Sequence, residues 1–125
     1  TPNCSSAASD VYKRQARYSS LRTDLSNSTK LLRDMKGVEK ENRTARFRCC
    51  LLGFHKGKTI CSEGTLEGEV AESFKGDSGF GYDPIFLIPE YGLHLAEMKK
   101  EDKNKISHRF KAFEVISKSL PSLFI

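Results

Sequence analysis

Residues 44–70 read TARFRCCLLGFHKGKTICSEGTLEGEV, and this stretch decides the fold. In its first part, Arg46 and Arg48 alternate with Ala, Phe and Cys before an apolar run begins. A period of two is typical of a β-strand that buries one face. Residues 44–54 are therefore predicted to form a strand that enters a hydrophobic core.

The second part of the stretch returns along the first. Lys56 and Gly57 supply a turn, and residues 58–61 are predicted to be the hairpin partner of the first strand. Glycines then set off a further strand around residues 66–70. The pattern indicates an antiparallel hairpin at the centre of the fold.

Helices and one more strand are predicted on either side of the hairpin. Upstream, residues 26–28 (Ser, Asn, Ser) offer N-caps for a short amphipathic helix that Gly37 ends. Downstream, residues 84–89 form an apolar run between prolines, which suits an edge or terminal strand. Ser107 can cap a final helix with apolar residues every three or four positions, until Pro121 stops it. The fold class is therefore α/β.

Length and charge restrict the kind of protein. A chain of 125 residues with 38% hydrophobic content is long enough for one domain with a core, or a piece of one. The net charge is +5, and residues 99–111 hold six basic residues against two acidic ones. A local basic cluster suits a phosphate-bearing ligand, although solvated helix ends are also rich in lysine.

Cysteine, histidine and hydropathy patterns make several other classes unexpected. The four cysteines include no CxxC pair and the three histidines are scattered, so neither a zinc site nor a disulfide framework is suggested. No apolar run approaches about 18 residues and no secretory leader is visible. The expectation is a cytoplasmic protein with reduced thiols, no membrane partner and no metal ligands of its own.

The first constellation with chemical meaning is GFGYDP at residues 79–84. Glycines let the backbone approach a ligand, while two aromatic rings and a carboxylate project nearby. Aromatic rings can stack on a base, and a carboxylate can accept a ring N–H. The same letters also fit a structural turn with core aromatics.

The second constellation is KNKISHR at residues 103–109. It lies at the start of the predicted final helix, where free backbone N–H groups favour anions. Arg109 and His108 could donate to a carbonyl on a base edge, and Lys103 could reach a ring or a phosphate. The alternative interpretation is a solvated basic helix start.

Together the two constellations resemble the signatures of one family. Residues 73–86, SFKGDSGFGYDPIF, are similar to the GFGYDPIF signature of the inosine triphosphate pyrophosphatase (Ham1-like) family, and residues 106–112, ISHRFKA, to its SHR-x-x-A signature. Segments at residues 16–19, 31–33 and 43–47 also resemble the family, in the expected order. The resemblance runs from Ala16 to about residue 120.

The resemblance implies a fold and an activity. The fold would be the C-terminal part of a mixed-sheet α/β domain with flanking helices, often a homodimer. The activity would be hydrolysis of a purine nucleoside triphosphate (ITP, dITP or XTP) to monophosphate and pyrophosphate with Mg²⁺. The positions that match the family's base-recognition residues are Phe80, Gly81, Tyr82, Asp83, Lys103, Ser107, His108 and Arg109.

The family's catalytic parts are expected upstream of Ala16. They are a phosphate loop with its Lys, a metal-binding Glu and a DSG-containing loop, and none of them is found in residues 16–125. Asp77-Ser78-Gly79 matches the last by letters only, because it lies inside the later signature. No catalytic residue is therefore assigned, and this chain alone is expected to be inactive.

Residues 1–15 are expected to be non-native and disordered. Asp10 to Gln15, DVYKRQ, looks like a translated sequencing adaptor, and the family resemblance begins at the next residue. Residues 16–125 would then be the pyrophosphatase portion.

A second hypothesis is a basic single-stranded nucleic-acid-binding module. A pI near 9.1 and aromatic residues followed by a basic cluster motivate it. Acidic residues at positions 63, 67, 69 and 72 interrupt any continuous basic track, so no nucleic-acid partner is expected.

Overall fold

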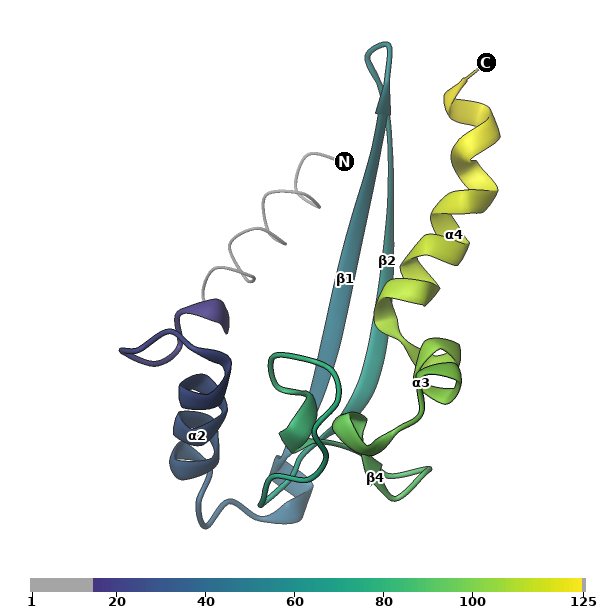
Figure 1. Cartoon of the computed structure of the whole chain (residues 1–125). Coiled ribbons are helices and arrows are strands. Elements are labelled where there is room, and N and C mark those ends of the chain that lie inside the picture. The colour runs from purple at the N-terminus through teal and green to yellow at the C-terminus, as the bar shows by residue number, and fades with distance from the viewer. Residues whose placement is uncertain (1–14, 125) are drawn as a thin grey trace.

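The computed structural model describes residues 15–124 (Figure 1). Within this range a four-stranded sheet in the order β1-β2-β3-β4 carries helix α4 along its long hairpin, and α2 stands beside the hairpin base. The α/β class is confirmed, and each described pair of neighbouring strands is antiparallel. The strands and helices are α2 (Asp24–Asp34), β1 (Thr44–His55), β2 (Lys58–Val70), β3 (Phe86–Ile88), β4 (Leu93–His94), α3 (Lys100–Ile106) and α4 (His108–Leu123).

The hairpin of β1 and β2 is continuous. Its register runs from Thr44 opposite Glu69 to His55 opposite Lys58. Lys56 and Gly57 form the turn with φ of 48° and 79°, the left-handed backbone that a tight hairpin turn requires. The predicted hairpin and its turn are confirmed.

The prediction of two separate strands at residues 58–61 and 66–70 was wrong, because β2 is one strand. Its glycines are sites of close packing. A Cβ at Gly64 would lie 2.1 Å from the carbonyl oxygen of His108, and a Cβ at Gly68 would lie 2.4 Å from the ring of Phe86. These glycines let α4 and β3 approach the strand.

Helix α4 packs on the face of the hairpin that carries Phe47 and Ser62. Ala112 is fully buried there, and its carbonyl oxygen accepts a hydrogen bond of 2.6 Å from the Ser62 hydroxyl. The predicted stop at Pro121 was wrong, since the helix continues to Leu123. Leu123 is 4% exposed, and this burial holds the last turn despite the missing proline N–H.

The ends of α2 also differ from the prediction. Thr23 caps the helix, with Ser26 as its capping-box partner, so residues 26–28 lie inside the helix. The helix ends at Asp34, before Gly37, which has a left-handed φ of 83° in the following turn. The helix exists where its apolar spacing predicted it, but it begins and ends earlier.

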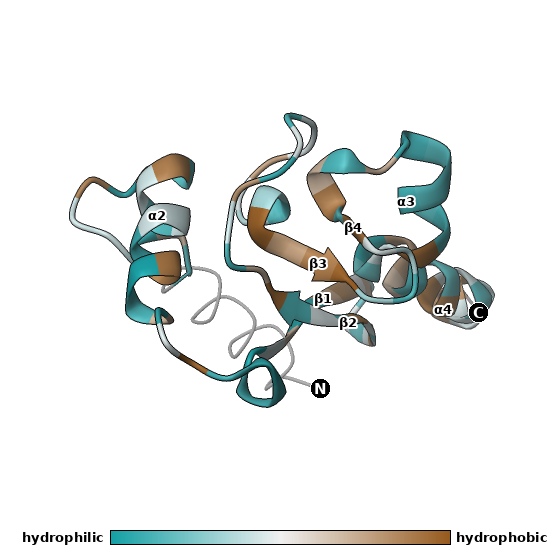
Figure 2. Cartoon of the chain, turned by 90° about the horizontal axis from the view of Figure 1, so that it is seen from below, coloured by the Kyte–Doolittle hydropathy of each residue, from teal (hydrophilic) through white to brown (hydrophobic). Residues whose placement is uncertain are grey.

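The apolar run at residues 84–89 lies inside the sheet. A 3₁₀ turn (Asp83–Ile85) leads into β3, which pairs with β2 on one side and with β4 on the other. Its prediction as an edge or terminal strand was therefore wrong, because the short β4 supplies the edge. Figure 2 shows the apolar β3 beside β2, and α2 set apart from it. The core around β3 consists of Leu66, Phe86, Ile88, Leu95 and Met98.

Arg43 joins α2 to the sheet. Its side chain is buried, and its guanidinium donates only to backbone carbonyl oxygens. One side bonds the end of β2, at Val70 (2.8 Å) and Ala71 (2.9 Å). The other side bonds the turn after α2, at Met35 (2.8 Å) and Val38 (3.3 Å). A single charged group therefore ties the turn after α2 to the end of β2.

The prediction that residues 1–15 are non-native lies outside the described residues, apart from Gln15. Between residues 15 and 124, no helix is both long and apolar enough to cross a bilayer.

We predict that Arg43→Gln strongly destabilises the chain. Buried carbonyl oxygens would lose their donors, at about 1–3 kcal/mol each, so the free energy of unfolding should fall by about 2–4 kcal/mol. Arg46→Gln is the matched control, because Arg46 makes an exposed ion pair with Glu67 that is expected to contribute less than about 1 kcal/mol. Urea denaturation measures the free energy of unfolding of both variants. Equal losses in the two variants would contradict the role of Arg43 in joining α2 to the sheet.

Candidate functional site

The glycine-rich loop after β2 has a backbone that only glycine adopts without strain. Gly79 and Gly81 have φ of 78° and 62°. A Cβ at Gly79 would lie 2.1 Å from Oδ2 of Asp83 and 2.6 Å from Nζ of Lys103. The loop therefore closes tightly over an ion pair, and the Phe80 ring between the two glycines is 61% exposed.

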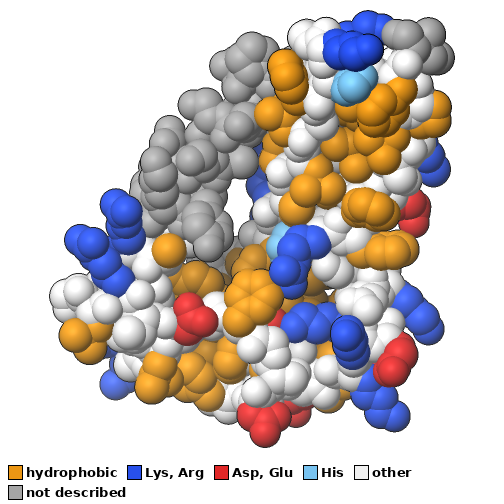
Figure 3. Space-filling view, turned by 45° about the horizontal axis from the view of Figure 1, so that its top comes forward, with side chains coloured by type: hydrophobic (Ala, Val, Ile, Leu, Met, Phe, Trp, Pro, Cys, Tyr) orange, Lys and Arg blue, Asp and Glu red, His pale blue; other side chains and the backbone are white. Residues whose placement is uncertain are grey.

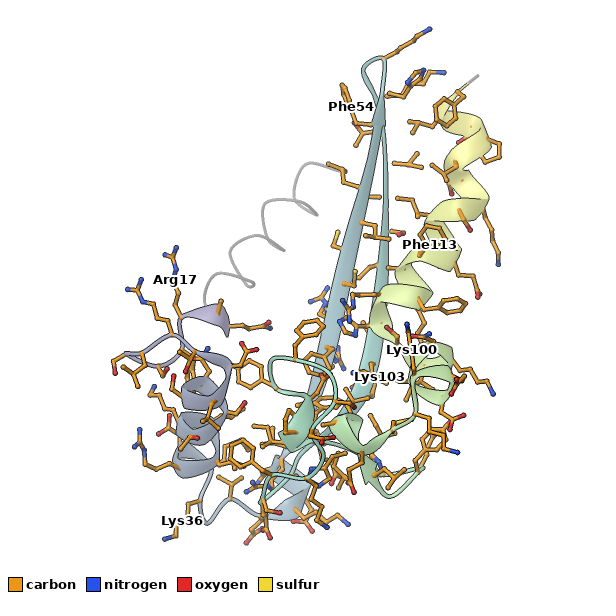
Figure 4. All side chains as sticks on the ribbon, viewed as in Figure 1. Arg17, Lys36, Phe54, Lys100, Lys103 and Phe113 are labelled. Carbon is orange, nitrogen blue, oxygen red and sulfur yellow. The ribbon has the colours of Figure 1, made fainter. Side chains whose placement is uncertain are left out.

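Asp83 and Lys103 form that ion pair. Their Oδ2 and Nζ atoms are 2.5 Å apart, and Asp83 is 7% exposed. The backbone N–H of Phe80 also points at Oδ2 of Asp83, at 3.4 Å. Figure 4 places Lys103 between α3 and the loop. The pair fixes the loop to α3. Asp83 and Lys103 therefore have a structural role in addition to any contact with a ligand.

The basic segment is divided between two helices. Lys103 and Lys105 belong to α3, whereas Ser107 caps α4, its Oγ accepting from the N–H groups of Arg109 (3.2 Å) and Phe110 (3.5 Å). The prediction that the whole segment starts one final helix was wrong in this respect, although the cap at Ser107 is confirmed. The break lets α3 and α4 converge on the loop from different directions.

Arg109 lies over the exposed ring of Phe80. Its Cζ atom is 4.8 Å from the ring centroid, a cation–π contact. The two predicted residues come from segments far apart in the sequence, and the fold places them side by side. The guanidinium and the ring together form an exposed, flat and positively charged surface.

His108 lies beneath this surface. Its imidazole stacks on Phe47 of β1, with ring centroids 5.1 Å apart and planes 19° apart. Its Nδ1 is buried and has no hydrogen-bond partner in the described part of the chain. Burial lowers the pKa of His108, as does the neighbouring charge of Arg109, while Asp83 opposes the shift. The imidazole is therefore held neutral near pH 7.

Tyr82 faces a different space. Its ring lines a cavity of about 340 Å³ between α2 and the sheet, which Phe47 also lines. Its hydroxyl donates to the carbonyl oxygen of Gln15 at 2.8 Å. Burial raises the pKa of Tyr82, and the Asp24 carboxylate adds to the effect. Tyr82 therefore faces the cavity beside α2, whereas Phe80 lies against Arg109.

Helix α2 holds the loop at Gly81. The Gly81 N–H donates to Oδ2 of Asp24 at 3.0 Å, and its carbonyl oxygen accepts from the Ser28 hydroxyl at 3.3 Å. These contacts position the loop from the side opposite α3. Neither Asp24 nor Ser28 was predicted as a site residue, because an Asp and a Ser near a helix start are typical of capping alone.

Phe47 is the other residue that the sequence did not point out. It stacks on His108 and also lies 4.3 Å, between ring centroids, from Phe86 of β3. In the sequence it is one apolar position of an alternating strand, which is the pattern of any core residue. Only the packing of α4 against β1 shows that Phe47 supports the site.

Metal binding has little support in this part of the molecule. Among residues 15–124, no group of three His, Cys, Asp or Glu side chains is placed to hold a metal ion. The buried carboxylate of the site, Asp83, already pairs with Lys103. The described residues therefore do not fit the Mg²⁺ that the resemblance implies, and no step is assigned to a metal here.

We predict that stability falls in acid through His108. Since the pKa of this group is lower folded than unfolded, its contribution is complete above the unfolded value of about 6.5 and is lost as the pH falls through the folded value. His108→Gln should reduce the loss of unfolding free energy between about pH 7.5 and about pH 5.5. His55→Gln, at the far end of β1, is the matched control for the loss of an imidazole. Urea denaturation at both pH values tests this, and an unchanged profile in His108→Gln would contradict the assignment.

Comparison with known proteins agrees with this geometry. The sequence profile described as the Ham1 family matches residues 11–119. A dITP/XTP pyrophosphatase of Listeria monocytogenes is 46% identical over 107 residues, which is 84% of this chain and 53% of the relative. A dITP/XTP pyrophosphatase of Bacillus subtilis is 48% identical over 98 residues, 78% of this chain and 50% of the relative. The chain thus spans about half the length of these relatives.

Solved structures agree with the sequence comparison. The Ham1 protein of Staphylococcus aureus superposes with a TM-score of 0.78 at 34% identity, covering 86% of this chain and 56% of its own. A HAM1 protein of Coxiella burnetii superposes with a TM-score of 0.76 at 33% identity, covering 87% of this chain and 57% of its own. Profile, sequence and structure coincide, and the chain belongs to the Ham1 family.

Proposed function

We propose that this chain carries the base-recognition half of an enzyme that hydrolyses non-standard purine nucleoside triphosphates. ITP, dITP and XTP would yield the monophosphate and pyrophosphate, which removes these nucleotides from the nucleotide pool. The observation that carries the proposal is the juxtaposition of Phe80, Arg109 and His108 at the start of α4. The names of the relatives, dITP/XTP pyrophosphatases, support the substrate class.

The proposed discrimination acts at the 6-position of the purine. Hypoxanthine and xanthine present an oxygen there, and the Arg109 guanidinium can only donate. A neutral His108 in the Nδ1–H tautomer is a second donor, and its buried Nδ1 has no partner in the described chain. Adenine presents an amino donor at the same position, and each unsatisfied buried donor costs about 1–3 kcal/mol. Selectivity of this kind follows from unpaired polar groups.

The purine ring is proposed to stack on Phe80. Base stacking on an aromatic side chain contributes about 1–3 kcal/mol and does not depend on the base. The ring is 61% exposed and already has Arg109 over it. Phe80 would therefore supply affinity while Arg109 and His108 supply selectivity.

The other predicted residues would act partly by positioning this surface. Asp83 and Lys103 hold the loop closed, and Ser107 orients Arg109 by capping α4. Gly81 anchors the loop to α2 through Asp24. Asp83 and Lys103 are also proposed to meet the base, where a carboxylate accepts a ring N–H and an ammonium donates. Tyr82 would contribute through the neighbouring cavity.

Phosphoryl chemistry is proposed to depend on sequence that matches the other half of the relatives. A divalent metal and cationic groups must stabilise the charge that develops on the phosphates. The described residues do not provide such a metal site, so the isolated chain is proposed to be inactive and Mg²⁺ to be held by the other half. The complete enzyme is proposed to be cytoplasmic and homodimeric.

Exposed apolar surface supports the need for further chain. Hydrophobic side chains gather on the upper hairpin and α4 (Figure 3). Phe54 is 70% exposed, Phe113 58% and Val115 51%. Large apolar side chains that are this exposed mark an interaction surface. The rest of the enzyme or a second subunit would cover it.

The nucleic-acid-binding alternative receives no comparable support from the described residues. On the exposed face of the hairpin, Arg46 pairs with Glu67 and Arg48 with Glu63. In the basic segment Lys103 pairs with Asp83. These paired charges interrupt a basic track that could follow a phosphate backbone.

We expect activity only when the other half is present. Pyrophosphate release would be measured on this chain and on a chimera that joins residues 16–125 to the upstream half of the Bacillus subtilis relative. With Mg²⁺, the chimera should hydrolyse dITP and XTP in preference to dATP, and the chain alone should hydrolyse none. Preference for dATP in the chimera would overturn the proposed substrate class. Turnover by the chain alone would overturn the proposal that catalysis depends on the other half of the enzyme.

Arg109→Met in the chimera tests the base-recognition role. Loss of a donor to the 6-oxygen should lower kcat/KM for dITP by about 100-fold, while the low activity on dATP changes little. Arg48→Met, on the opposite face of the hairpin, is the control and should leave both values unchanged. If Arg109→Met keeps the parent's preference for dITP over dATP, Arg109 does not read the base.

A further inference from the structure

Three consecutive polar residues of α2 bond three different parts of the chain. Asn27 bonds the segment of residues 16–19, which precedes the helix. Ser28 bonds the glycine-rich loop, and Thr29 bonds the preceding turn of α2. Asn27 and Ser28 are 3% and 1% exposed, whereas Thr29 is exposed. Asparagine and serine are not favoured inside a helix, so their burial here indicates a role in joining α2 to its neighbours.

Asn27 holds the preceding segment through both polar atoms of its amide. Its Oδ1 accepts a hydrogen bond of 2.7 Å from the N–H of Ser19, and its Nδ2 donates to the carbonyl oxygen of Ala16 at 3.0 Å. The hydroxyl of Ser19 also lies 2.5 Å from that of Ser26, one position before Asn27. Ser19 is 9% exposed, so the bond to its N–H is shielded from water. The amide therefore fixes the segment that leads into α2.

Ser28 holds the glycine-rich loop from the next position of the helix. Adjacent residues of an α-helix point in directions about 100° apart, so Asn27 and Ser28 face different neighbours. The Ser28 hydroxyl donates to the Gly81 carbonyl oxygen at 3.3 Å, and the Asp24 carboxylate accepts from the Gly81 N–H at 3.0 Å. Helix α2 is therefore a shared support for the preceding segment and for the loop that carries Phe80.

We propose that Asn27 is a positioning residue, which aligns the rest of the enzyme with the base-recognition loop. This role rests on the proposed function, in which phosphoryl chemistry depends on the upstream half of the enzyme. Residues 16–19 then link that half to α2. Because Asn27 fixes the link and Ser28 fixes the loop, α2 sets the placement of the reacting phosphates relative to the recognised base. A misplacement of about 1 Å in such an alignment can lower the rate by about 100-fold.

A general loss of stability predicts a different result from a loss of alignment. Both Asn27→Ala and Ser28→Ala remove a buried side chain's hydrogen bonds, so a purely structural role would change the same kinetic constant in both variants. Alignment predicts a split. The Asp83–Lys103 ion pair and the Ser107 cap hold the base-recognition surface independently of the preceding segment, so base affinity should survive the loss of Asn27.

The kinetic test compares three alanine variants in the chimera of residues 16–125 with the upstream half of the Bacillus subtilis relative. Asn27→Ala should lower kcat for dITP, per folded molecule by circular dichroism, by about 10–100-fold. Its KM and its preference for dITP over dATP should not change. Ser28→Ala should instead raise KM by about 3–10-fold with little change in kcat, because it loosens the loop. Thr29→Ala is the control and should leave both constants unchanged.

Hydrogen exchange of the 125-residue chain tests the positioning without catalysis. In Asn27→Ala, the amides of residues 16–23 should exchange about 3–10-fold faster, while those of residues 79–82 keep the parent's rate. Ser28→Ala should give the opposite pattern, with faster exchange in the loop alone. Thr29→Ala should match the parent in both segments, because its hydroxyl bonds Leu25 of the same helix.

The outcomes separate this role from the proposed function. In an active chimera, Asn27→Ala with the parent's kcat, or with the same rise in KM as Ser28→Ala, would overturn the positioning role. Unchanged exchange of residues 16–23 in Asn27→Ala would overturn it whatever the chimera does. A parent chimera with no activity on dITP or XTP would overturn the proposed function, and the alignment role of Asn27 with it.

Discussion

The close approach of α4 to the middle of β2 is the constraint on which the rest of the molecule depends. A hydrogen atom at Gly64, in place of a side chain, lets the backbone at His108 settle against the strand. That contact fixes where the first turn of α4 begins. The Ser107 cap, the His108 imidazole on Phe47 and the Arg109 guanidinium over Phe80 all take their positions from it. The hairpin is therefore the platform of the candidate site as well as the centre of the core.

A second set of polar contacts brings the glycine-rich loop to this platform. The Asp83–Lys103 ion pair joins the loop to α3, and Gly81 joins it to α2. Desolvation of a charged pair is unfavourable, so a buried ion pair contributes little net stability. Its role here is to position the loop. It orients the Phe80 ring outward, toward the guanidinium that completes the surface.

The hairpin could be predicted from the sequence more fully than the candidate site. Alternation along residues 44–54 encodes a strand face directly, so β1 and its turn could be predicted. The cap of α2 at Thr23 could not, because it depends on how the preceding chain arrives. The place of β3 inside the sheet depends on strand order, and no local pattern records it. Phe47 looked like any core residue, since its contact with His108 arises only from packing between distant segments.

Arg43 has a consequence for how the sequence can change over evolutionary time. Its guanidinium recognises carbonyl oxygens at four positions and no side chain. Every amino acid presents the same carbonyl, so the residues at those positions can drift without disturbing the junction. The side chains of the turn after α2 and of the segment that ends β2 can therefore diversify while the placement of the two segments is inherited unchanged.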